Sequence, residues 1–156
     1  DPAGIGGLAD AAEAFDRIAR SGKRPFISRA DDSGTFHIER VIWRSKGIVP
    51  AGAWYFEAGR SMLDVLKMAN ERQAYTLVDA GTWLANRRDS PLKVYVRGGR
   101  RLERIYSILL LSEKKLPRLN HKGARAFVSW MRSDTARKII RGLNVDGEPL
   151  FSVLPK

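Results

Sequence analysis

Apolar residues recur along the chain in two patterns, one with the spacing of a helix and one in short continuous runs. Helical spacing predicts helices over 9–20, 35–45, 61–72, 81–86, 121–131 and 133–141. Short apolar runs, typical of buried strands, occupy 25–28, 75–78, 92–96 and 105–111, and a compact aromatic segment at 53–56 fits a strand or a loop. Helices that alternate with short apolar strands predict an α/β fold with a mixed or parallel sheet.

Local residue chemistry supports several of these boundaries. Gly22 and Gly142 follow helical segments and are expected to end them. Ser133 or Asp134 is well placed to cap the last helix, because a short polar side chain accepts hydrogen bonds from the first turn. The pair Gly98-Gly99 predicts a turn between the last two strands.

The composition is that of an ordinary globular protein and excludes several kinds of chemistry. The chain has 156 residues, a length that can bury a real hydrophobic core, and it has no cysteine. Disulfide scaffolds, thiolate zinc sites, iron–sulfur clusters and thiol nucleophiles are therefore excluded. No apolar run approaches the ~18–20 residues of a membrane span.

The net charge of +11 is distributed unevenly. Residues 1–78 carry 11 basic and 10 acidic side chains, whereas residues 79–156 carry 17 and 7. Within 87–104, seven basic side chains accompany only Asp89 and Glu103. Such a segment attracts polyanions such as nucleic acid, an acidic membrane surface or an acidic partner. A solvated basic surface with no specific partner is the alternative.

The segment 25–39 carries the clearest candidate chemistry. A predicted strand delivers Ser28 and Arg29 to its C-terminal end, and the polar turn 31–34 then opens a helix near Thr35. Open α/β sheets bind ligands at this place, outside the carboxyl ends of their strands. Free backbone N–H groups and the helix dipole favour an anion there.

The side chains of this turn suit a small oxyanion. Gly34 allows close approach of the backbone, and the hydroxyls of Ser33 and Thr35 can donate hydrogen bonds. Arg29 adds a permanent charge with forked donors. The sequence therefore predicts an oxyanion site at the turn.

Other interpretations of the same residues remain open. In a plain helix cap, Asp32 or Ser33 satisfies the first turn while Arg29 pairs with Asp31 or Glu39. Asp31, Asp32 and Glu39 are also a carboxylate set for a hard cation, which the neighbouring Arg29 disfavours.

An enzyme is the third class of function to weigh, beside an anion-binding module and a nucleic-acid-binding domain. The sequence has no nucleophile–base pair, glycine-rich phosphate loop ending in Lys, or metal cluster. His37 and His121 lie far apart in the sequence, and we expect His37 to be a surface or packing residue. We therefore expect a protein without catalytic residues and without a bound metal.

The turn and its surroundings resemble a known motif. Ser28-Arg-Ala-Asp-Asp-Ser-Gly-Thr35, followed by Glu39 and Trp43, resembles the central motif of the tungstate-binding proteins of ABC importers. These are extracytoplasmic receptors for tungstate and sometimes molybdate. The resemblance covers essentially the whole chain through segments in the same order, at 1–5, 54–62, 74–82, 106–111, 123–130 and 147–151.

The resemblance implies an α/β fold of the periplasmic-binding-protein-like type II class, with a mixed sheet flanked by helices. Residues 1–106 would form the central lobe of a two-lobed binding protein. Residues 107–156 would supply the return crossover strand and C-terminal helices of the other lobe. The ligand would lie in the cleft between the lobes.

The resemblance also implies which residues bind. Arg29 and Thr35 match the positions expected to touch the oxyanion, with Ser33, Ser28 and Gly34 as further ligand-binding candidates. The ligand would be tungstate or molybdate, with no cofactor. The implied partner is the membrane subunit of an ABC transporter, and the implied location is periplasmic or otherwise extracytoplasmic.

Two departures from the family pattern qualify the expected site. The Thr/Ser-rich anion-binding turn of the family's first lobe is not found in the chain, and Ala80 stands where the family pattern has arginine. The chain also begins at Asp-Pro without methionine. We therefore expect an N-terminal segment missing from this chain, or a second chain, to complete the cleft. The alternative to oxyanion capture is nucleic-acid binding through 87–104.

Overall fold

The computed structural model describes residues 1–154, so the last two residues of the segment expected at 107–156 lie outside the described residues. The chain divides into two compact units, Asp1–Glu103 and Arg104–Lys156. None of the helices in residues 1–154 combines the length and the apolar character that a membrane span requires.

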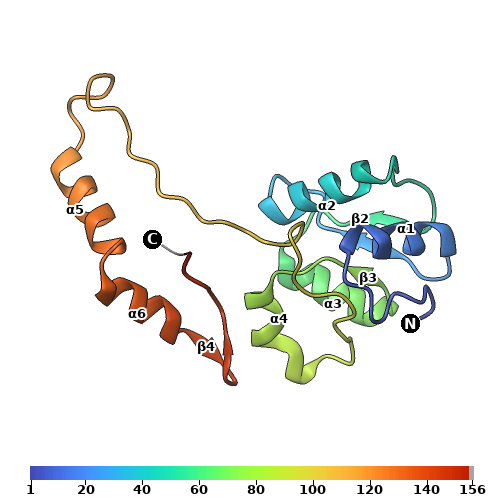
Figure 1. Ribbon diagram of the computed structural model, residues 1–156. Helices are drawn as coiled ribbons and strands as arrows, with labels where there is room; N and C mark the ends of the chain where they lie inside the picture. The colour runs from blue at the N-terminus through green and yellow to red at the C-terminus, as the bar shows by residue number, and fades with distance from the viewer. Residues whose placement is uncertain (155–156) are drawn as a thin grey trace. The chain divides into compact units, whose positions relative to one another are not determined.

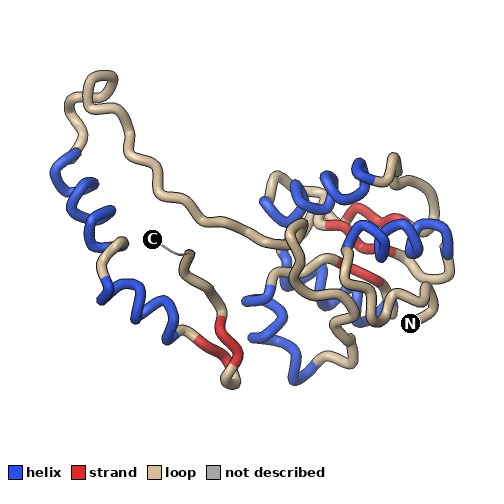
Figure 2. Tube along the Cα trace, viewed as in Figure 1, coloured by secondary structure: helices blue, strands red, loops and turns tan. Residues whose placement is uncertain are grey.

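The first unit is built on a three-stranded parallel sheet with helices on both faces (Figures 1 and 2). The strand order is β2-β1-β3, with strands β1 Phe26–Ser28, β2 Tyr55–Glu57 and β3 Tyr75–Thr76. Both pairings of the central strand are parallel. The helices are α1 Ala11–Ser21, α2 Gly34–Ser45, α3 Met62–Arg72 and α4 Ala80–Asn86, followed by the 3-10 turn η1 Arg87–Asp89.

The alternation of side chains along β1 divides the core between the two faces of the sheet. Phe26 packs with Phe15 of α1 and Trp43 of α2, with ring centroids 5.2 Å from each. Ile27 points to the other face and packs with Val65 of α3. Ser28 follows two residues after Phe26, which directs its side chain toward α2. Strand β1 is fully buried, so each of its side chains packs against a helix on one face of the sheet or the other.

Polar caps begin each helix of the first unit. Asp10, Ser33, Ser61 and Asp79 each accept a hydrogen bond from a backbone N–H of the following first turn. Such caps satisfy donors that have no partner within the helix. The helices predicted over 9–20, 35–45, 61–72 and 81–86 are thus confirmed to within two residues at each end.

The predicted α/β fold class is confirmed, with two corrections to the sheet. The three strands of the first unit pair in parallel, one of the two pairings that the sequence pattern allowed, whereas the resemblance implied a mixed sheet. The strands predicted at 92–96 and 105–111 are wrong, since neither segment forms a strand in the structure. A strand requires a neighbouring backbone to complete its ladder, and apolar character alone does not supply one. Tyr95 and Val96 instead pack as side chains against the core of the first unit.

The second unit contains two helices and a small hairpin. Its elements are α5 His121–Met131, α6 Asp134–Gly142, β4 Asn144–Val145 and β5 Glu148–Pro149. Both predicted helices are confirmed, and Ser133, not Asp134, caps α6 by accepting from Ala136 N. The strands β4 and β5 pair antiparallel across Asp146 and Gly147, both at positive φ.

The second unit lacks a developed core among its described residues. Among residues 104–154, only His121 and Ala136 are buried. The exposed large apolar side chains are Ile105, Tyr106, Ile108, Leu109, Leu110, Leu111, Leu116, Leu119, Phe127, Trp130, Ile139, Leu143, Phe151 and Leu154. In the first unit, by contrast, more large apolar side chains are buried than exposed.

Candidate oxyanion site at the carboxyl edge of the sheet

The candidate site lies where the parallel strands of the first unit end. Ser28, Glu57 and Thr76 are the last residues of β1, β2 and β3, so their carboxyl ends share one edge of the sheet. The chain leaves β1 at this edge through the turn 29–33 and enters α2 at Gly34. The expected arrangement, a strand followed by a polar turn and a helix N-terminus, is therefore present.

A left-handed residue shapes the turn. Ala30 has a φ of +48°, a region that L-residues other than Asn and Asp rarely occupy. The Ala30 backbone N–H donates to Ser28 Oγ at 3.2 Å, and the Ser33 N–H donates to Asp31 Oδ1 at 3.1 Å. Ser33 Oγ then accepts from Phe36 N at 3.2 Å as the cap of α2. Short-range hydrogen bonds thus hold the whole turn.

Arg29 is the cation of the site, and one of its donors has no partner. Its Nη2 donates to Asp31 Oδ2, and its side chain is 20% exposed. Its Nε is buried and has no hydrogen-bond partner. Buried donors are nearly always satisfied in folded proteins, so an orphaned guanidinium N–H indicates a place for an acceptor.

Asp31 is the counterion of Arg29. Burial raises the pKa of its carboxyl, but hydrogen bonds from the Ser33 hydroxyl and N–H and the charge of Arg29 outweigh burial and lower the pKa overall. Asp31 is therefore ionised at neutral pH and holds the guanidinium in place. Of the two pairings considered from the sequence, Arg29 makes the one with Asp31.

Ser28 and Thr35 are both buried. Ser28 is fully buried, and its hydroxyl donates to Glu39 Oε2 at 2.9 Å. Thr35, in the first turn of α2, is 5% exposed. Arg29, Ser33, Gly34 and Thr35 lie together at the turn and the helix start, whereas the Ser28 side chain points inward to α2.

Glu39 is a buried carboxyl surrounded by neutral donors. Besides Ser28, Trp43 Nε1 donates to its Oε1 at 3.2 Å and the Tyr55 hydroxyl donates to the same oxygen at 2.8 Å. Burial raises the pKa of Glu39, and the three hydrogen bonds only partly oppose it. Burial and the adjacent Glu39 likewise raise the pKa of Tyr55.

Sequence reasoning did not identify Tyr55 as part of this site. The available signal was a carboxylate at 39 on the apolar face of a helix, four residues before Trp43, which requires buried donors to satisfy it. Which donors do so depends on the pairing of β2 with β1, which local sequence does not reveal.

The structure also bears on the helix-cap and cation-site interpretations of the turn. Ser33, not Asp32, caps α2, so the cap exists alongside the orphaned Arg29 donor. His37 is exposed, as expected for a surface residue. No group of three or more metal-ligating side chains is found in residues 1–154.

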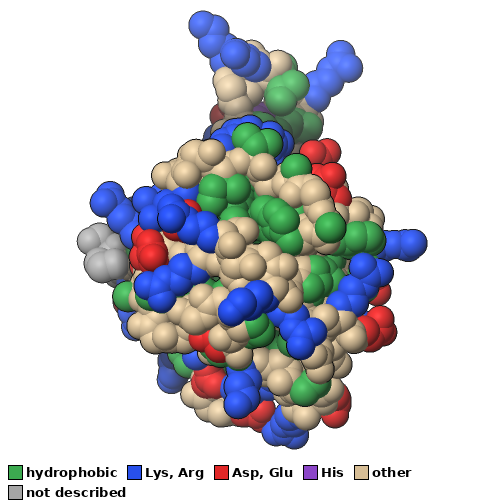
Figure 3. Space-filling model, turned by 90° about the vertical axis from the view of Figure 1, so that its right-hand side faces the viewer, with side chains coloured by type: hydrophobic (Ala, Val, Ile, Leu, Met, Phe, Trp, Pro, Cys, Tyr) green, Lys and Arg blue, Asp and Glu red, His purple; other side chains and the backbone are tan. Residues whose placement is uncertain are grey.

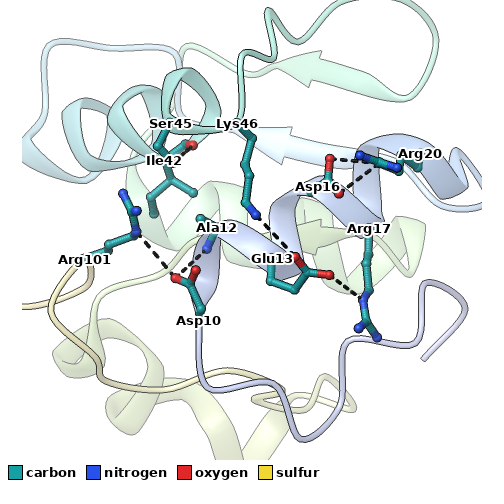
Figure 4. Close-up of polar contacts among 10 residues, drawn as sticks. All are labelled: Asp10, Ala12, Glu13, Asp16, Arg17, Arg20, Ile42, Ser45, Lys46 and Arg101. Atoms are coloured by element: carbon teal, nitrogen blue, oxygen red, sulfur yellow. Dashed lines mark hydrogen bonds and ion pairs between the residues drawn. The ribbon is translucent and has the colours of Figure 1, made fainter.

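Residues 87–103 of the basic segment belong to the first unit. Arg101 Nε lies 3.5 Å from Asp10 Oδ1, and Figure 4 shows the two side chains directed toward each other. A pocket of about 170 Å³ lies here, lined by Ala9, Asp10, Ala11, Gly98, Gly99, Arg100 and Arg101. On the face shown in Figure 3, basic side chains are scattered with acidic ones among them. The pairing uses part of the charge that suggested a polyanion partner.

Comparison with known proteins adds to this geometry. The model of the PBP superfamily domain matches residues 2–135. The chain is 42% identical over 132 residues to the tungstate-binding protein TupA of Peptoclostridium acidaminophilum, covering 83% of this chain and 46% of that protein. The solved tungstate-binding protein TupA of Desulfovibrio alaskensis G20 has a TM-score of 0.83 and 33% identity, covering 97% of this chain and 62% of that one.

A second solved structure agrees. The tungstate ABC transporter protein from Geobacter sulfurreducens has a TM-score of 0.72 and 36% identity, covering 90% of this chain and 59% of that one. The chain spans about half the length of the curated relatives it matches. These relatives are binding proteins, not enzymes. The chain therefore belongs to the PBP superfamily, and its resemblance to the tungstate-binding proteins is confirmed.

Proposed function

We propose that this protein is the solute-binding component of an ABC importer and captures a tetrahedral oxyanion, tungstate or molybdate. The observation that carries the proposal is the buried Nε of Arg29, which has no acceptor and lies in the turn that opens α2. A dianion would satisfy this donor and would also meet the positive end of the helix dipole.

The proposed contacts come from the turn and from the first residues of α2. Arg29 supplies the guanidinium, Thr35 a hydroxyl, and Gly34 and Thr35 the first backbone N–H groups of α2. Ser33, whose hydroxyl and N–H donate to Asp31, holds the turn in place. Asp31 holds the Nη2 side of the guanidinium, which leaves Nε for the ligand. Such binding replaces the hydration shell of the anion and makes or breaks no covalent bond.

We further propose that residues 107–156 belong to a second lobe, which residues outside this chain complete. Exposed apolar side chains such as Leu109, Phe127 and Trp130 support this, because folded proteins rarely leave so much apolar surface uncovered. The length of the relatives supports it as well. An extracytoplasmic location and docking to a transporter membrane subunit follow from the same proposal.

Titration calorimetry of the full-length protein with tungstate, molybdate and sulfate tests the proposed function. We expect Arg29→Ala to weaken tungstate binding by about 10- to 100-fold, the usual range for a charge-assisted hydrogen bond of about 1.5–3 kcal/mol. The Arg29→Lys variant keeps the positive charge but lacks Nε, so it should also bind tungstate more weakly than the unaltered protein.

Arg24→Ala is the matched control, because Arg24 is an exposed arginine of the same unit, one residue before the strand-leading Pro25. It should bind tungstate like the unaltered protein. Absence of binding to all three anions by the unaltered protein would refute the proposed function.

A further inference from the structure

The buried carboxyl of Glu39 lies behind the candidate site without forming part of its surface. Glu39 is 2% exposed on α2, the helix whose N-terminus contributes to the site. Its two oxygens receive three hydrogen bonds, and it has no cationic partner among them. Burying a carboxyl without a cation is costly, so the arrangement calls for a role that an apolar side chain would not fill.

The two oxygens of Glu39 have separate tasks. Oε1 accepts from Trp43 Nε1 and from the Tyr55 hydroxyl, which tie the carboxyl to α2 and β2. Oε2 accepts from the Ser28 hydroxyl alone. Oε1 therefore fixes the position of the carboxyl, and Oε2 orients the hydroxyl of Ser28 at the end of β1.

The hydrogen bond that Ser28 donates to Glu39 determines which other hydrogen bonds the Ser28 hydroxyl can make. A serine hydroxyl has one hydrogen, and at Ser28 this hydrogen is given to Glu39. The oxygen of Ser28 is then left to accept, and it accepts from the Ala30 N–H at 3.2 Å. Ser28 thus has no hydrogen left for a ligand.

The Ala30 N–H belongs to the turn that presents Arg29. Ala30 has a φ of +48°, which an alanine adopts only when its surroundings hold it there. The hydrogen bond to Ser28 is one such constraint. Arg29, immediately before Ala30, carries the unpartnered Nε.

We infer that Glu39 is a positioning residue for the oxyanion site: its carboxylate orients the Ser28 hydroxyl, which holds the left-handed turn at Ala30 and thereby presents Arg29. The inference rests on the proposed function for its ligand. Under this inference, Ser28 does not contact the anion but supports the turn that presents Arg29.

Glu39→Gln tests the inference with little change of volume. Trp43 Nε1–H can only donate, so the glutamine oxygen must face Trp43 and Tyr55 and the glutamine amide must face Ser28. The substitution therefore replaces an acceptor with a donor at Ser28 alone. We expect tungstate affinity in the full-length protein to fall at least tenfold.

Three further variants separate positioning from stability. Ser28→Ala should weaken tungstate binding similarly, and adding Glu39→Gln to it should cause little further loss, because both act through one chain of hydrogen bonds. Ile42→Val, a fully buried change on the same helix, should lower the melting temperature without changing affinity by more than twofold. Additive losses in the double variant, or an equal loss of affinity in Ile42→Val, would overturn the inference.

Amide hydrogen exchange of Ala30, followed by NMR without ligand, gives a readout that does not need the anion. Exchange should accelerate in Glu39→Gln and Ser28→Ala and stay unchanged in Ile42→Val. If the unaltered protein binds no tungstate, the proposed function fails while the exchange rates still decide the positioning role. An unchanged Ala30 exchange rate in Glu39→Gln would overturn the positioning role itself.

Discussion

Replacing Ala30 by glycine should stabilise the first unit, although it removes a methyl group. Ala30 has a φ of +48°, where the Cβ of an L-residue crowds the backbone and costs about 1–2 kcal/mol. Glycine does not suffer this clash, but its greater freedom in the unfolded chain costs about 0.5–1 kcal/mol. The difference leaves a net gain of about 0.5–1 kcal/mol for Ala30→Gly.

Urea unfolding followed by tryptophan fluorescence measures this gain, because Trp43 is buried in the core of the same unit. For a unit of about this size, the gain corresponds to an increase in melting temperature of about 2–8 °C. A matching slope of free energy against urea concentration would show that both proteins unfold to the same extent.

The reverse substitution at an equivalent backbone conformation is the control. Gly22 ends α1 with a φ of +55°, and a Cβ built there meets no atom within 4 Å. Gly22→Ala should therefore lose about 1 kcal/mol through backbone conformation alone. A loss of stability in Ala30→Gly, or no loss in Gly22→Ala, would refute the argument from φ.

Three further predictions concern the core, the caps and pH. The pKa of Glu39 is raised above 4.5, so its stabilising contribution is full below about pH 4.5 and is lost as the pH rises through the folded-state value. Urea titrations at several pH values should therefore show Glu39→Gln losing less stability than the unaltered protein over that range, and parallel profiles would contradict this. Ile27→Ala should cost about 2–5 kcal/mol in the same assay because Ile27 is 0% exposed, whereas Leu63→Ala, at 37% exposed, should cost much less. Ser61→Ala should cost about 1 kcal/mol by removing the cap of α3, and Ser61→Thr, which keeps the hydroxyl that donates to Asp64 Oδ2, should recover most of it.

Much of the candidate site followed from the sequence because it is local. Ser33 caps α2 and Arg29 pairs with Asp31, and both contacts join residues no more than three apart. Their geometry depends on the turn alone. A polar turn between a buried strand and an apolar helix therefore predicted both the location of the candidate site and its cation, Arg29.

The role assigned to Ser28 did not follow from local sequence. The resemblance to the tungstate-binding proteins made Ser28 a candidate to bind the ligand. Its hydroxyl instead donates to Glu39, eleven residues away, whose carboxyl is fixed by Tyr55 on the neighbouring strand. The partner of a buried hydroxyl is decided by which strands and helices pack together.

By itself the sequence determined the helices, their caps, the α/β class and the polar turn that suits an anion, since helical periodicity and capping act over a few residues. The tertiary structure alone decided which apolar runs became strands. Residues 26–28 have strands on both sides, whereas 92–96 and 105–111 have no neighbouring strand in the described part of the chain. A strand is stable only when another backbone satisfies its hydrogen-bonding groups, and that backbone is distant in sequence.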